Sequence, residues 1–210
     1  MIKNIGQEMY DWAVDLFPIN RSLSGDGVRQ TLRYIKNIIS ELEVNEVPSG
    51  TKCFDWTIPK EWNCDDGYII DPDGNKICDF KNNNLHVVGY STPIDKEIEY
   101  EELIEHLYHI EDQPTAIPYI TSYYSERWGF CLSFNKFKKL KKGTYKVKIN
   151  SELKDGNLTY GEIKIKGESE KEIFLSTYVC HPSMANNELS GPVLTTTLIK
   201  WLKTLPELNY

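Results

Sequence analysis

Residues 180–191 read Cys-His-Pro-Ser-Met-Ala-Asn-Asn-Glu-Leu-Ser-Gly and directly follow the apolar run 173–179, Ile-Phe-Leu-Ser-Thr-Tyr-Val. An apolar run rich in β-branched and aromatic residues predicts a buried central strand. Helical spacing of apolar residues follows over 192–202. A strand, a polar loop and a helix in succession predict an α/β fold, with His181 at the carboxyl edge of the sheet, where such folds place their chemistry.

This loop contains candidate metal ligands, His181, Asn187 and Glu188. Neutral imidazole and carboxylate are suitable zinc ligands, and the tight turn over 184–189 can bring Asn187 or Glu188 back toward the histidine. The spacing also fits a histidine with a purely structural role. No catalytic acid or base is assigned.

The composition is that of a globular protein, with 210 residues, 40% hydrophobic and 26% charged. A formal charge of -7 argues against nucleic acid or an anionic membrane as a partner, because both attract a basic surface. The chain has neither a signal-like start nor a run of about 18 apolar residues. We therefore expect a cytoplasmic protein, whose five cysteines lack CxxC spacing and fit reduced thiols.

The remaining pattern predicts two parts. Helices are expected over 7–17 and 27–43, and strands over 44–47, 144–149 and 158–165. Residues 51–148 cluster Trp, Tyr, Pro, Asp and Gly between short strand-like runs, which indicates an inserted, mostly β domain with one helix at 101–109. The α/β domain then comprises 1–50 and 149–210.

The loop resembles the first metal-ligand segment of the aminopeptidase-like proteins related to co-catalytic zinc aminopeptidases. Similar family stretches are Arg21–Arg29 (RSLSGDGVR), Val47–Trp62, Thr121–Tyr124 and Trp128–Phe130. The resemblance implies a three-layer α/β/α domain, incomplete in this chain, interrupted by a β-rich domain and associated with surface-polysaccharide biosynthesis. It also implies one or two zinc ions and hydrolysis of a peptide or other amide substrate.

Two positions depart from the family pattern. Asn187 stands where the family has a metal-bridging aspartate, and Ser183 stands where relatives orient the histidine with an aspartate. An amide brings no charge to offset metal cations. The family's general base and remaining ligands come from downstream segments, so we expect the 210-residue chain to be inactive alone. The alternative is a non-catalytic pseudoenzyme that binds a glycan or peptide.

Candidate substrate-binding residues lie outside this loop. They are Arg21, Tyr123, Tyr124, Arg127 and Trp128. Aromatic faces and guanidinium groups bind sugar rings and anionic groups, although a packed aromatic cluster and an internal ion pair are the alternatives. An incomplete sheet also predicts an unpaired edge, through which the chain could form a homo-oligomer.

Overall fold

The structure is a computed structural model that describes residues 4–210. The chain folds as a mixed α/β protein with small sheets and divides into two compact units. Unit 1 comprises the residues up to Ile58 together with Asn157–Tyr210, and unit 2 comprises Pro59–Gly156. Over residues 4–210, every helix is too short or too polar to cross a bilayer.

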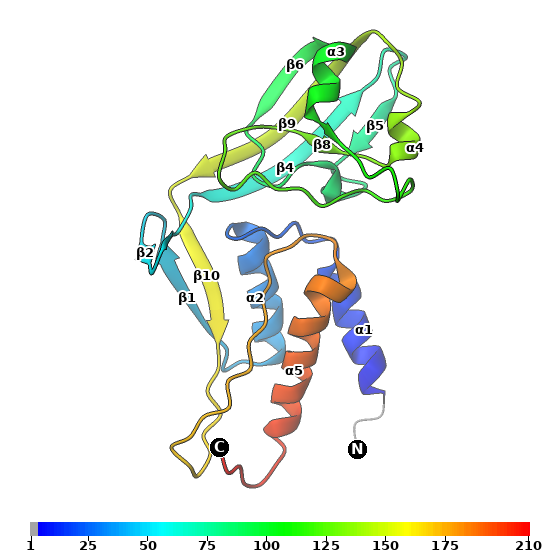
Figure 1. The fold of residues 1–210 in the computed structure, drawn as a ribbon. Coiled ribbons are helices and arrows are strands. Elements are labelled where there is room, and N and C mark those ends of the chain that lie inside the picture. Colours follow the sequence, from blue (N-terminus) through cyan, green and yellow to red (C-terminus); the bar gives the residue numbers. More distant parts are fainter. Residues whose placement is uncertain (1–3) are drawn as a thin grey trace. The chain divides into compact units, whose positions relative to one another are not determined.

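Unit 1 combines helices with two short strand pairs (Figure 1). Its helices are α1 (Ile5–Leu16), α2 (Asp26–Ile38) and α5 (Ser190–Leu202), and a π-helical turn (Ala185–Leu189) precedes α5. Its strands are β1 (Glu43–Pro48), antiparallel to β10 (Asn157–Glu162), and β2 (Lys52–Cys53), antiparallel to β3 (Trp56–Thr57). Segments from the two ends of the chain therefore build this unit together.

Two apolar clusters hold unit 1. In α2, Val28, Leu32 and Ile35 recur at helical spacing and are buried with Leu42. In the other cluster, Leu16 of α1 packs with Leu189 and Val193 from the π-helical turn and α5. The second cluster fixes the start of α5 against the end of α1.

Unit 2 is mostly β. Its antiparallel sheet has the strand order β5-β4-β9-β6, with β4 (Glu61–Ile70), β5 (Lys76–Asp79), β6 (Ile94–Glu99) and β9 (Thr144–Lys154). Smaller elements are α3 (Tyr100–Leu103), α4 (Phe134–Phe137), the 3-10 turns Asn84–His86 and Ile104–His106, and the parallel pair β7 (Leu107–Tyr108) and β8 (Phe130–Cys131). The sheet's core includes Ile69, Tyr145, Val147 and Ile149, each at most 2% exposed.

The predicted central strand at 173–179 is wrong. This segment has no regular secondary structure, and Phe174 is 88% exposed. A strand must share its backbone hydrogen bonds with a neighbouring strand, and no described strand pairs with these residues. His181 therefore follows an irregular apolar segment.

Two predicted helices end earlier than expected. The helix predicted over 27–43 ends at Ile38, and the chain enters β1 at Glu43. The helix predicted over 101–109 ends at Leu103, because the chain tightens into the 3-10 turn and then pairs as β7. The strand predicted over 158–165 ends at Glu162 with its partner β1.

A hairpin turn forms around Asp71. The Asp71 carboxylate accepts hydrogen bonds from the backbone N–H groups of Asp73 (3.0 Å) and Asn75 (2.7 Å). Gly74 has φ +84°, a left-handed conformation that glycine adopts without steric cost. The polar run is therefore a turn between β4 and β5.

Candidate functional site

The predicted ligand loop forms a π-helical turn in unit 1. The backbone N–H of Leu189 donates to the carbonyl of Met184, 3.3 Å away and five residues earlier. This wide turn buries Glu188 and Leu189 while Asn187 stays exposed. Single π-helical turns often occur at functional sites, and here the turn directs Glu188 inward ahead of α5.

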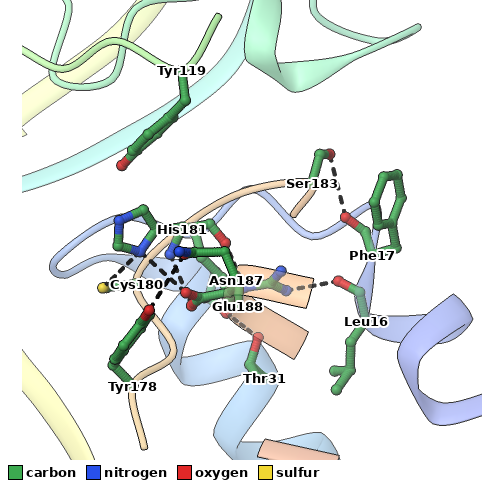
Figure 2. Close-up of polar contacts among 12 residues, drawn as sticks. Leu16, Phe17, Thr31, Tyr119, Tyr178, Cys180, His181, Ser183, Asn187 and Glu188 are labelled. Atoms are coloured by element: carbon green, nitrogen blue, oxygen red, sulfur yellow. Dashed lines mark hydrogen bonds and ion pairs between the residues drawn. The ribbon is translucent and has the colours of Figure 1, made fainter. Parts of the chain in front are cut away.

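Glu188 contacts His181 at two points (Figure 2). Its Oε1 accepts a hydrogen bond from the His181 backbone N–H at 2.8 Å, and its Oε2 lies 3.1 Å from His181 Nδ1. The carboxylate is 1% exposed, and the imidazole is partly exposed. One buried acid thus fixes both the backbone and the ring of the histidine.

Arg21 anchors the same cluster from the loop between α1 and α2. Its Nη1 donates to the carbonyl of Leu16 (2.7 Å), and its Nε donates to the carbonyl of His181 (3.0 Å). Nε also lies 3.9 Å from Glu188 Oε1, and both side chains are fully buried. These contacts give Arg21 a positioning role, and the substrate contact expected from the sequence stays a prediction.

Burial sets the electrostatics of this cluster. It lowers the pKa of Arg21 to about 10, although the charge of Glu188 opposes the shift. Burial also raises the pKa of Glu188, against the opposing effects of the His181 N–H and the charges of His181 and Arg21. Arg21 remains cationic at neutral pH and supplies the positive charge that faces the buried carboxylate.

Cys180 joins the cluster, and its Sγ lies 3.0 Å from His181 Nδ1. One potential ligand atom from each of Cys180, His181 and Glu188 lies within 4.8 Å of the others. Burial and the Glu188 charge raise the pKa of the Cys180 thiol to about 12, so the thiol is protonated in the metal-free cluster. Thiolate, imidazole and carboxylate are the three common kinds of zinc ligand, so the donor set fits a zinc ion.

The other predicted loop residues lie beside this cluster. The Oδ1 of Asn187 accepts a hydrogen bond from the Tyr178 hydroxyl at 3.4 Å. The Ser183 hydroxyl donates to the carbonyl of Phe17, also at 3.4 Å. The carboxylate that contacts the His181 ring belongs to Glu188, and the metal-ligand roles predicted for Asn187 and Glu188 stay predictions.

Gly191 allows the apolar segment to approach α5 closely. A Cβ atom on this residue would lie 2.0 Å from Thr177 Oγ1. Such a distance is well below van der Waals contact, so only glycine fits without movement. The glycine therefore allows the irregular segment before His181 to lie against the first turn of α5.

The predicted aromatic residues lie in unit 2 and form separate contacts. Tyr123 shares a 2.9 Å hydroxyl hydrogen bond with Tyr119, and Tyr124 packs edge-on against Tyr123 but is 88% exposed. Trp128 stacks on His106 with ring centroids 3.6 Å apart. Substrate binding by these residues stays a prediction.

Arg127 has internal contacts in the same region. Its Nη2 donates to the carbonyl of Thr121 at 3.2 Å, and its guanidinium lies over the Tyr108 ring, 5.5 Å from the centroid. A cationic group over an aromatic face is a stabilising arrangement.

Sequence reasoning missed Cys180 as a donor and Arg21 as an anchor. Cys180 lacks the spaced partner cysteine that usually marks a zinc site. Arg21 lies 160 residues from the His181 carbonyl it binds, and no local pattern encodes that contact. A free cysteine adjacent to the candidate histidine was the one available signal.

The fold matches a solved protein provisionally called a peptidase. A crystal structure of this Clostridium acetobutylicum protein superposes with a TM-score of 0.95 at 50% sequence identity. The match covers 99% of this chain and 49% of that chain. The α/β arrangement described above is thus shared with that protein.

The chain belongs to the DUF4910 family, a domain of unknown function, whose family model matches residues 10–210. It is also 52% identical over 200 residues to a C. acetobutylicum protein provisionally named a polysaccharide biosynthesis protein with an aminopeptidase-like domain. That match covers 95% of this chain and 46% of the relative. The chain spans about half the length of the curated relative it matches.

Proposed function

We propose that this chain carries part of the site of a metal-dependent hydrolase that cleaves a peptide or other amide bond. The observation that carries the proposal is the buried Glu188 carboxylate, which holds His181 at both its backbone and its ring. The peptidase-type fold and the name of the aminopeptidase-like relative support the same reaction class.

The residues of the cluster have distinct tasks in this proposal. His181 supplies a metal ligand, Glu188 fixes its position, and Arg21 ties that pair to the end of α1. Asn187 lies on the exposed side of the turn and is a further candidate metal ligand through its amide oxygen. A bound zinc ion would lower the pKa of a water molecule and polarise the scissile carbonyl.

The remaining parts of the machinery are proposed to lie in the half of the longer relatives that this chain does not cover. They include a general base, further ligands and the strands that complete a three-layer α/β/α domain. Unit 2, inserted between β3 and β10, would then be an accessory domain in a cytoplasmic enzyme of surface-polysaccharide biosynthesis. Neither nucleic acid nor a membrane is a proposed partner.

The proposal is tested by hydrolysis of aminoacyl p-nitroanilides by the natural full-length protein. Activity should depend on added zinc and fall by about 100-fold or more in His181→Ala, because a metal ligand is lost. Ser183→Ala is the matched control, since Ser183 lies in the same loop and bonds only weakly to Phe17. Full zinc-dependent activity in His181→Ala would refute the assignment.

One observation favours a second function, binding of a glycan or peptide without hydrolysis. Tyr124 exposes 88% of its surface beside Tyr123, and exposed aromatic rings stack on sugars. Tyr124→Ala should then weaken binding on a glycan array, whereas Phe54→Ala, which removes a fully exposed ring from unit 1, should not. Equal binding by both variants and the parent would reject this function.

A further inference from the structure

Cys180 places a sulfur donor on the histidine that the metal-site proposal centres on. Its Sγ is 3.0 Å from His181 Nδ1, and that nitrogen is 3.1 Å from Glu188 Oε2 (Figure 2). The three atoms come from adjacent residues of one loop and from the turn seven residues later. Cys180 Sγ and Glu188 Oε2 both lie close to Nδ1 of the imidazole.

We propose that Cys180 Sγ, His181 Nδ1 and Glu188 Oε2 form a three-ligand site for one zinc ion. This inference rests on the proposed function only in taking His181 as a metal ligand. It names a donor set that differs from the His181, Asn187 and Glu188 set expected from the sequence.

The separations suit the ion. In a tetrahedral site, zinc bonds of about 2.0–2.3 Å place ligand atoms about 3.3–3.6 Å apart. The 3.0 and 3.1 Å separations from His181 Nδ1 need to widen by only a few tenths of an ångström. The Cys180 sulfur and a Glu188 carboxylate oxygen lie within 4.8 Å of each other, and side-chain rotation would set that third separation. Three protein ligands leave the fourth position open, as in catalytic zinc sites.

The surroundings also favour Cys180 over Asn187 as the third ligand. Asn187 is exposed, and its Oδ1 is engaged by the Tyr178 hydroxyl. Glu188 Oε1 is committed to the His181 N–H and faces Arg21, whereas Oε2 faces His181 Nδ1, so a cation bound by these two atoms would replace their direct contact. A thiolate brings the negative charge and the softness that an amide oxygen lacks.

Proton and charge balance are satisfied on binding. Cys180 releases its thiol proton to solvent as the metal–sulfur bond forms, and Glu188 binds as a carboxylate. His181 binds as neutral imidazole through Nδ1, so its ring proton resides on Nε2. The two negative ligands and the Arg21 cation nearby leave the cluster with a net charge of +1 when a divalent ion is bound.

Cobalt substitution tests the inference on the 210-residue chain. Titration with Co²⁺ should produce the near-ultraviolet charge-transfer band that a cobalt–thiolate bond gives. Cys180→Ser should abolish this band and weaken Co²⁺ and Zn²⁺ binding by about 10-fold or more, since a charged ligand is lost. Cys53→Ser is the control, because Cys53 is an exposed thiol of the same unit.

A second readout covers the case in which Cys180→Ser disturbs folding. X-ray absorption at the zinc edge of the zinc-loaded parent chain should show a sulfur neighbour at about 2.3 Å, the length of a zinc–thiolate bond. Cobalt binding without a thiolate band, or bound zinc without a sulfur neighbour, would overturn this inference and leave the metal proposal standing. Absence of any Co²⁺ or Zn²⁺ binding by the 210-residue chain would also overturn this inference, whereas the metal proposal is decided by zinc-dependent hydrolysis in the full-length protein.

Discussion

Glu188 binds His181 twice, through the backbone N–H at 2.8 Å and through Nδ1 at 3.1 Å. The seven-residue separation is closed by the π-helical turn, which aims Glu188 inward. The histidine is therefore held by an acid of its own loop, and Arg21 bonds to the same loop at the His181 carbonyl. Arg21, His181 and Glu188 therefore hold one another in position.

The buried ion pair should show strong coupling. Arg21→Met leaves Glu188 without its buried cation, and Glu188→Leu leaves Arg21 without its carboxylate, so each should lower the unfolding free energy by about 3 kcal/mol. The double variant should lose clearly less than the sum of the two, as measured by urea denaturation.

An exposed pair provides the control for that cycle. Lys200 and Glu8 are 2.6 Å apart on the partly exposed surfaces of α5 and α1, so Lys200→Ala should cost only about 0–1 kcal/mol. Additive losses at Arg21 and Glu188 would show that the two side chains do not interact.

Gly191→Ala should destabilise the chain by about 1–3 kcal/mol, the usual cost of overpacking, because its Cβ would meet Thr177 Oγ1. Gly191→Ala combined with Thr177→Ala should recover part of the loss. Gly6→Ala is the matched control, since no atom lies within 4 Å of its added Cβ. Thermal unfolding measures all three, and equal stability of Gly191→Ala and the parent would mean that the segment does not pack on α5.

His86 should make the stability of unit 2 depend on pH. Burial lowers the pKa of His86, whose Nδ1 lies 2.6 Å from the Cys131 carbonyl. The folded state thus favours the neutral ring, so its stabilising effect is present above the unfolded value of about 6.5 and is lost as the pH falls through the lowered folded pKa.

A variant isolates this effect from the other titrating groups. His86→Asn retains an N–H donor and cannot titrate, so its unfolding free energy should fall less than that of the parent between pH 7.5 and 5. Urea denaturation at both pH values gives the comparison. Identical pH dependence in the two proteins would contradict a buried, neutral His86.

Thiol reactivity should separate the cysteines. Burial raises the pKa of Cys64, Cys78 and Cys131 to about 12, whereas Cys53 is exposed. Because the thiolate is the reactive form, a disulfide reagent at neutral pH should modify Cys53 in the native protein and the three buried thiols only after unfolding. Rapid modification of all four in the native state would indicate an open unit 2.

Local patterns predicted much of the fold. The helical spacing of Val28, Leu32 and Ile35 located α2, and the strand predicted over 44–47 corresponds to β1. The segment 173–179 was wrongly predicted to be a strand. An apolar run indicates the local β propensity of its residues, but it does not indicate whether a partner strand is present. Whether a strand finds a partner strand depends on how the whole chain folds.

The candidate site was predictable only where its parts are close in sequence. His181 and Glu188 belong to one motif, and the structure brings them into contact. The anchoring by Arg21 depends on how α1 ends against α5, which no local pattern expresses. Cys180 was visible but gave no spacing signal until its distance to Nδ1 was known.

The central claim is that His181 is a metal ligand. Crystals of the zinc-loaded protein, with diffraction recorded on both sides of the zinc absorption edge, test it directly. The account predicts an anomalous peak within bonding distance of His181, about 2.0–2.1 Å from its ligating nitrogen, which disappears in His181→Ala. A zinc-loaded crystal with no peak at His181, or with the same peak in His181→Ala, would contradict it.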